Sequence, residues 1–229
     1  MLPQLDPDEC RVVGVMIEKA HTTPAQYPMT LNAITAGCSQ KSNRHPVVNF
    51  DEMQVQDTLD RLRAKGLAVM VDMAGSRVLK YKHDLRQTLG LSTSERVVMA
   101  ELLLRGPQTL GELRTRASRM HPLESLEVVQ NVLQHLMDRD EPFVKRLAPT
   151  PGSRAERYAQ LLCPDLHPVE LLGVEAAATG TTRTDQTALA DRVQRLELEV
   201  AQLRQVVRRV AVSLGEPQLA DDPAENGIE

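Results

Sequence analysis

The side chains that most often bind metals or attack substrates are spread thinly along this chain. The three cysteines, Cys10, Cys38 and Cys163, and the six histidines form no CxxC, HxxxH or zinc-finger spacing, so we expect no metal site. The sequence has no GxGxxG or Walker-type phosphate loop and no GxSxG nucleophile elbow. We therefore expect a protein that is not an enzyme and uses no cofactor; an enzyme with an unrecognised site is the open alternative.

The chemistry that the sequence does suggest is phosphate binding by side chains in the first third of the chain. Lysine and arginine neutralise phosphates, and amide side chains donate to base edges. The candidate nucleic-acid-binding residues are Gln40, Lys41, Asn43, Arg44, Arg61, Arg63, Lys65, Arg77, Lys80 and Lys82. The alternative is an ordinary solvated surface. In the loop at 38–50, the alternative is that polar side chains only order the local backbone.

The elements that would position these residues follow from the spacing of apolar residues in 1–88. Helices are expected to begin at caps at Asp6 or Asp8, at Thr30 and at Asp51, and strands are expected at 67–73 and 78–83. Three helices followed by a hairpin are typical of a winged-helix domain, in which the hairpin is the wing.

The same order recurs in residues 89–168, and an internal repeat predicts a tandem fold. The third expected helix of each copy has the same four-then-three apolar spacing: Val55, Leu59 and Leu62, then Val129, Leu133 and Leu136. The predicted fold class is mainly α with small β-hairpin wings. It comprises tandem winged-helix domains at 1–88 and 89–168 and a C-terminal coiled-coil helix.

Carboxylates lie where DNA-binding winged helices normally meet bases. The third helix of such a domain usually enters the major groove, but here Glu52 and Asp57 would repel phosphates. The third helix of the second domain exposes Glu127. Arginines of the second domain, Arg114, Arg116 and Arg119 among them, either form a basic patch or pair with carboxylates that hold the two domains together.

A strict seven-residue repeat occupies 185–214, after a predicted linker at 169–184. Valine at most a positions and leucine at most d positions favour a parallel two-stranded coiled coil, so we expect a homodimer. The dimerisation residues are Leu189, Val193, Leu196, Val200, Leu203, Val207, Val210 and Leu214. The alternative is a single amphipathic helix that packs on its own domain. Residues 215–229 are predicted to be a disordered acidic tail.

Composition narrows the class of protein further. The formal net charge is −4, and all of the negative excess falls in residues 169–229, so the two domains are balanced. Aromatic residues make up only 2% of the chain, which excludes an RNA-recognition sheet built on stacked aromatics. There is neither a leader-like start nor an apolar run of membrane-spanning length, so we expect a cytoplasmic protein with no membrane partner.

Several motifs together resemble the bacterial YceH-like family. They are Thr22-Thr23-Pro24, Gln26-Tyr27-Pro28, the QKSNR string at 40–44, Pro46-Val47, the segment 102–120 and the PFVKRL string at 142–147. The resemblance covers about residues 1–162 and implies two winged-helix domains of the DNA-binding type, without implying an activity. His45 and Leu110 depart from the residues common in the family.

These observations predict a homodimeric tandem winged-helix protein that binds duplex DNA, a candidate transcriptional regulator. The competing prediction is a protein-interaction scaffold that uses winged-helix surfaces without reading DNA sequence. The acidic third helices suit that role better than groove insertion.

Overall fold

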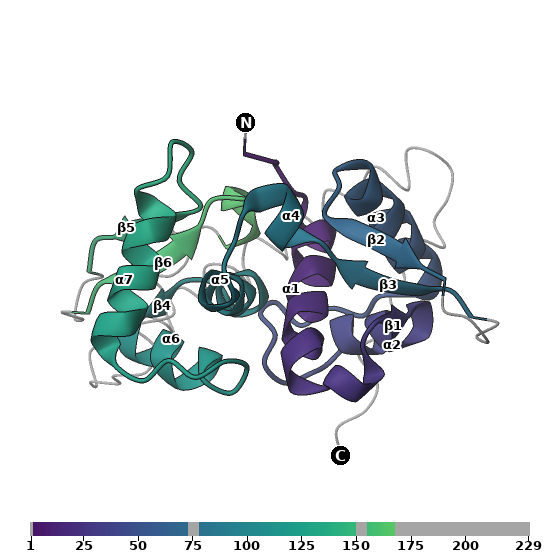
Figure 1. The fold of residues 1–229 in the computed structure, drawn as a ribbon, viewed down its shortest axis with the longest axis horizontal. Helices are drawn as coiled ribbons and strands as arrows, with labels where there is room; N and C mark the ends of the chain where they lie inside the picture. The colour runs from purple at the N-terminus through teal and green to yellow at the C-terminus, as the bar shows by residue number, and fades with distance from the viewer. Residues whose placement is uncertain (1, 73–77, 150–154, 168–229) are drawn as a thin grey trace, which may run out of the picture. The chain divides into compact units, whose positions relative to one another are not determined.

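The computed structural model describes residues 2–72, 78–149 and 155–167, and this part of the chain is mainly helical with two small antiparallel sheets (Figure 1). The first half contains α1 (Pro7–Thr22), η1 (Pro24–Gln26), β1 (Met29–Thr30), α2 (Leu31–Cys38), α3 (Glu52–Ala64), β2 (Ala68–Val71), β3 (Lys80–His83) and α4 (Leu85–Leu89). The second half contains α5 (Thr93–Arg105), β4 (Gln108–Thr109), α6 (Leu110–Ala117), α7 (Leu126–Met137), β5 (Val144–Leu147), β6 (Arg157–Gln160) and η2 (Pro164–Leu166). The predicted heptad helix, the linker, the acidic tail and Arg77 lie outside the described residues.

Local capping explains where the helices begin. Of the possible caps at the start of α1, Asp6 is the one used: Glu9 N donates to Asp6 Oδ1, and Asp6 N donates to Glu9 Oε2, both at 2.8 Å. This reciprocal pair satisfies two backbone donors that the first turn of a helix leaves free. The same capping box recurs at α5 and α6. The predicted caps Thr30 and Asp51 are confirmed at α2 and α3.

Each sheet has three strands, one more than the predicted hairpin. The order is β1-β3-β2 in the first half and β4-β6-β5 in the second. In the first sheet, Met29 of β1 and Met70 of β2 both lie opposite Tyr81 of β3. The added strands, β1 and β4, have only two residues each, too few to show the alternation by which strands are predicted.

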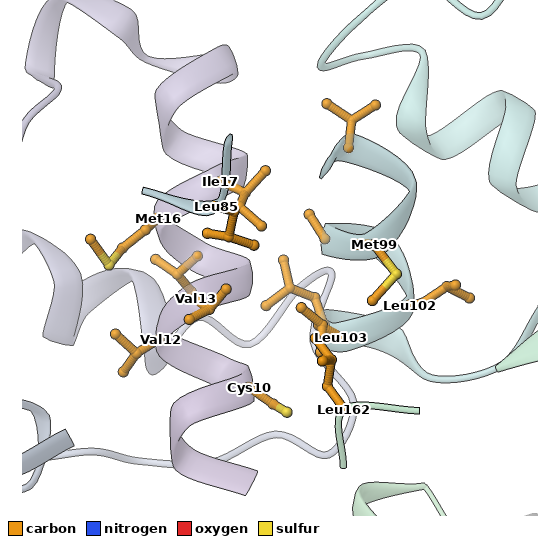
Figure 2. Close-up of a cluster of buried hydrophobic side chains, with 14 of the residues drawn as sticks. Cys10, Val12, Val13, Met16, Ile17, Leu85, Met99, Leu102, Leu103 and Leu162 are labelled. Atoms are coloured by element: carbon orange, nitrogen blue, oxygen red, sulfur yellow. The ribbon is translucent and has the colours of Figure 1, made fainter. Parts of the chain in front are cut away.

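The first helix of each half lies at the centre of the described chain, where α1 and α5 pack side by side (Figure 1). Gly14 lets the two helices approach closely, because a Cβ at this position would lie 2.8 Å from Leu104 Cγ of α5. Every residue of α1 from Glu9 to Glu18 is buried, as expected for a helix surrounded by protein. Side chains of both helices, with Leu85 and Leu162, belong to one hydrophobic cluster (Figure 2). The two halves therefore share a single core.

Candidate interaction surfaces

The loop between α2 and α3 contains Arg44, whose side chain is 0% exposed. Arg44 Nη2 lies 2.6 Å from Glu18 Oε2 in α1. The same guanidinium donates from Nε to the carbonyl oxygen of Gly37 at 3.2 Å, and from Nη2 to Gln40 Oε1 at 3.0 Å. A buried charge is tolerated when it is paired and its hydrogen bonds are satisfied, and Arg44 meets both conditions. The guanidinium is therefore directed into the protein.

The Glu18 carboxylate also binds Arg119 from the second half. Arg119 Nη2 in turn lies 3.0 Å from Glu101 Oε1 of α5, and Arg105 Nε lies 3.0 Å from Glu101 Oε2. Positive and negative groups thus alternate from Arg44 to Arg105 across the junction of the halves. Burial opposes ionisation of Glu18, but hydrogen bonds and charges of Arg44 and Arg119 outweigh it and hold its pKa below the ordinary value. The pairs with Arg44 and Arg119 therefore stabilise Glu18 in its ionised form.

Main-chain contacts attach the same loop to the second half. His45 N donates to the carbonyl oxygen of Leu104 at 2.7 Å, and His167 Nε2 donates to the carbonyl oxygen of His45 at 2.7 Å. The rings of His45 and His167 stack with centroids 5.8 Å apart. Arg11 of α1 donates to the carbonyl oxygen of Pro46. The loop therefore bridges α1, α5 and the segment after β6.

Three of the nucleic-acid candidates consequently lie at this junction. Gln40 and Arg44 bind each other, and Asn43, whose φ is 60°, accepts a hydrogen bond from Arg105. Lys41, next to them, is exposed and has no ion pair among the described residues. These three side chains are engaged within the protein. Lys41 is the loop cation that faces solvent.

The cations at the end of α3 are paired with carboxylates. Arg61 Nη2 lies 3.2 Å from Asp6 Oδ2, and Lys65 Nζ lies 2.6 Å from Glu9 Oε2. Arg63 pairs at 2.8 Å with a carboxylate one turn earlier in its own helix. The pairs of Arg61 with Asp6 and of Arg63 are exposed on both sides and contribute little stability, whereas Glu9, the partner of Lys65, is 0% exposed. The paired carboxylates reduce the positive charge that the end of α3 would present to a phosphate.

The β2–β3 hairpin places two lysines on one face. Lys80 and Lys82 alternate with Tyr81 along β3, so both point away from the buried tyrosine. They lie opposite Val71 and Val69 of β2. Neither lysine has an ion pair among the described residues. We call Lys80, Lys82, Val69 and Val71 the lysine face of the hairpin.

The first turns of α3 and α7 share a different chemistry. Met53 of α3 is 74% exposed and lies beside exposed Glu52. In α7, Leu126 and Val128 are 46% and 37% exposed and flank exposed Glu127. The carboxylates were expected from the sequence, whereas the exposed apolar residues were missed. Met53 lies off the apolar stripe of its helix, and this position could have indicated from the sequence that its side chain is exposed.

Cations of the second half are divided between the junction and its hairpin. Arg119 belongs to the junction, as in the prediction that arginine–carboxylate pairs join the domains. Arg116 pairs with Glu112 at 3.1 Å, and Arg146 pairs with Glu156 at 3.4 Å. Lys145 is exposed on β5 without a pair among the described residues.

Burial holds two titratable groups of the described residues in their neutral forms. No group of three or more His, Cys, Asp or Glu side chains among the described residues could hold a metal ion. Burial raises the pKa of Cys38 to about 12 and lowers that of His83 to about 4. A thiol and a neutral imidazole are the forms present at neutral pH. In the same described residues, no helix is long and apolar enough to span a bilayer.

The family model whose description is "Protein of unknown function, DUF480" matches residues 5–153. The chain belongs to the DUF480 family. A UPF0502 protein from Pelobacter propionicus is 49% identical over 206 residues, covering 89% of this chain and 91% of its own. A UPF0502 protein from Shewanella pealeana is 45% identical over 206 residues, covering 88% and 95%. The resemblance to the YceH-like family is confirmed, because YceH is a UPF0502 protein like these relatives.

Proposed function

We propose that each half of this DUF480 protein is a winged helix and that the pair binds duplex DNA without enzymatic activity. Each half has a helix, a short strand, two helices and a hairpin, and the short strand completes the sheet of the hairpin. This is the element order of winged-helix domains, with α3 and α7 as third helices and the β2–β3 hairpin as the first wing. The predicted homodimer, regulatory role and cytoplasmic location belong to the same proposal.

The lysine face is the observation that carries the DNA proposal. Lys80 and Lys82 project from one side of a wing and have no ion pair among the described residues, whereas the cations at the end of α3 are paired. With Lys41 they allow three phosphate contacts per chain. The logarithm of the binding constant should then fall with the logarithm of salt concentration with a slope of about −2.7. Such binding is modest in affinity and weak in sequence preference.

The proposed complex leaves the third helices out of the major groove. Carboxylates at Glu52 and Glu127 face solvent in their first turns, where inserted helices normally contact bases. Phosphate contacts by a wing fix position without reading sequence. We therefore propose backbone binding rather than base recognition.

Fluorescence anisotropy with a labelled duplex, measured over a salt series, tests the proposal. Lys80→Glu/Lys82→Glu is expected to lower the affinity roughly tenfold or more at low salt and to flatten the salt slope. The matched control, Arg114→Glu/Lys145→Glu, makes the same change of charge at exposed cations of the second half and should keep most of the affinity. Equal losses in both variants, or binding that ignores salt, would contradict a site on the first wing.

A second candidate function, a protein-interaction scaffold, is favoured by the exposed apolar side chains of the third helices. Met53, Leu126 and Val128 combine with neighbouring carboxylates, a composition that suits a basic, amphipathic protein partner better than DNA. Met53→Ser/Leu126→Ser should leave DNA affinity unchanged and remove partners crosslinked to the wild type in cells. Unchanged crosslinks in this variant would count against the scaffold.

A further inference from the structure

The strand β2 forms an edge of the first sheet. In the order β1-β3-β2, β2 pairs with β3 alone. Asp84 N donates to the carbonyl oxygen of Leu67 at 2.9 Å. Leu67 and Asp84 are therefore a hydrogen-bonded pair of the β2–β3 ladder. Because bonded and non-bonded pairs alternate in an antiparallel ladder, Val69 and Val71 bond toward β3. The N–H and C=O groups of Ala68 and Met70 then point away from the sheet.

No described residue covers this edge with backbone hydrogen bonds to Ala68 or Met70. All four residues of β2 are apolar, and Met70 is 40% exposed. Proteins usually protect such an edge with charged side chains, proline or a covering segment. An uncovered apolar edge strand is a template for another strand.

The equivalent edge in the second half is protected. In the order β4-β6-β5, β5 occupies the position that β2 has in the first sheet. Two of its four residues, Lys145 and Arg146, are exposed cations. The same architecture thus appears twice in one chain, once with a charged edge and once with an apolar edge. Of these two edge strands, β2 is therefore the one that has no charged side chains to prevent pairing with another strand.

We propose that β2 pairs in antiparallel fashion with β2 of a second copy of this chain, joining two three-stranded sheets into one of six strands. A second copy fits because the edge opposes itself without repulsion: from Leu67 to Val71 it has no charged residue. The same self-pairing at β5 would bring Lys145 and Arg146 against their own copies. Antiparallel pairing of identical strands is an isologous contact, which closes as a twofold dimer.

The outward groups fix the register. A twofold axis normal to the sheet at Val69 places Val69 opposite its own copy. Ala68 then lies opposite Met70 of the second copy, and these two residues exchange N–H and C=O groups on both sides of the axis. All outward groups of Ala68 and Met70 are satisfied in this register. Val69 occupies the central, non-bonded pair, in which Cβ atoms are about 4.5–5.5 Å apart.

This dimer would enlarge the lysine face, a step that rests on the proposed DNA binding. A twofold axis normal to the sheet keeps each face on its own side, so Lys80 and Lys82 of both copies share one face. The two β3 strands are three strand spacings apart, about 14 Å. Two linked copies double the phosphate contacts, and linkage raises affinity without a new kind of contact. The predicted heptads at 185–214 are separate in sequence from β2.

Disulfide trapping in the full chain tests the pairing. Val69→Cys should give a disulfide-linked dimer when treated with copper–phenanthroline, since the native cysteines are all buried. Leu126→Cys, exposed on α7, is the matched control and reports collisions, including those within a heptad dimer. A Val69→Cys yield several-fold above the control supports the proposal. A yield equal to the control overturns it.

Removing one outward donor provides a second measurement. In Val69→Cys/Met70→Pro the N–H lost at Met70 is one that β3 does not use, so the internal ladder keeps its bonds. The disulfide yield should drop to the control level; an unchanged yield overturns the register. Slow hydrogen exchange of the Met70 amide in the unmodified chain supports pairing, and exchange at the rate of a free amide overturns it. A trapped dimer that does not bind DNA overturns the proposed function alone, whereas DNA binding without trapping overturns this pairing alone.

Discussion

Arg44 and Glu18 form a buried ion pair, with Nη2 and Oε2 2.6 Å apart and side chains 0% and 2% exposed. Glu18 simultaneously binds Arg119 of the second half. The loop, the central helix of the first half and the second half therefore meet at one carboxylate. This ion-pair network contributes to holding the two halves in one orientation.

Removing one member of this pair should strongly destabilise the protein. Arg44→Met leaves the buried Glu18 carboxylate with Arg119 and with Lys19, whose Nζ lies 3.9 Å from Glu18 Oε2. The loss of unfolding free energy is therefore expected at the lower end of the about 3–5 kcal/mol that breaking a buried ion pair costs. Urea denaturation followed by circular dichroism gives the value. The control Arg63→Met removes an exposed pair and should cost about 1 kcal/mol or less. Similar losses in the two variants would show that the buried ion pair contributes no more to the free energy of unfolding than an exposed pair does.

The close approach of α1 and α5 makes a second prediction. Gly14→Ala places a Cβ 2.8 Å from Leu104 Cγ, and overpacking of this kind costs about 1–3 kcal/mol. Gly111→Ala in α6 meets no atom within 4 Å, so it should be neutral or stabilise the protein by up to about 1 kcal/mol through helix propensity. Thermal melts of both variants test the contrast. A Gly14→Ala variant as stable as Gly111→Ala would contradict tight packing of the halves.

Local sequence patterns predict where many of the helices begin. Contacts between residues that are far apart in the sequence could not be predicted in this way. Caps such as Asp6 and Asp51 are recognisable because the capping side chain and its backbone donor are three residues apart. Arg44 was assigned to a candidate nucleic-acid surface because its partner Glu18 is 26 residues away and belongs to another element. Sequence patterns give the charge of a side chain but not the direction in which a long loop turns it.

The five-residue helix α4 shows the same limit. It occupies the connection between the halves, and the predicted domain boundary after residue 88 falls inside it. A helix this short has too little periodicity to be detected. Its Leu85 packs in the shared core. The organisation of the halves around α1 and α5 thus depends on contacts that only the folded chain reveals.

His83 should make the stability of the protein depend on pH. Burial, followed by the charges of Arg96, His21 and Lys82, lowers its pKa from 6.5 to about 4; the Tyr27 ring, 5.9 Å away, also faces it. Below pH 6.5, His83 is therefore protonated in the unfolded chain, whereas in the folded chain it becomes protonated only near pH 4. The free energy of unfolding should fall as pH decreases through this window, by up to about 3 kcal/mol.

Urea titrations between pH 7 and pH 4.5 measure this dependence. His83→Asn should reduce the slope and leave the smaller contributions of His21 and His167, whose pKa values burial also lowers, whereas the same change at exposed His135 should leave the slope intact. Equal slopes in the wild type and His83→Asn would assign the pH dependence to other groups.

The carboxylates of α3 distinguish wing binding from helix insertion. Glu52→Gln/Asp57→Asn removes two negative charges from the exposed side of the helix without changing the shape of the side chains. If the third helix stays outside the groove, duplex affinity should rise no more than about twofold, because exposed charges more than a Debye length from the phosphates are screened. An inserted helix would instead gain roughly tenfold or more from the lost repulsion. Anisotropy at 0.15 M salt separates these results. In the same background, Lys80→Glu/Lys82→Glu should lower the affinity roughly tenfold or more only if the wing holds the DNA.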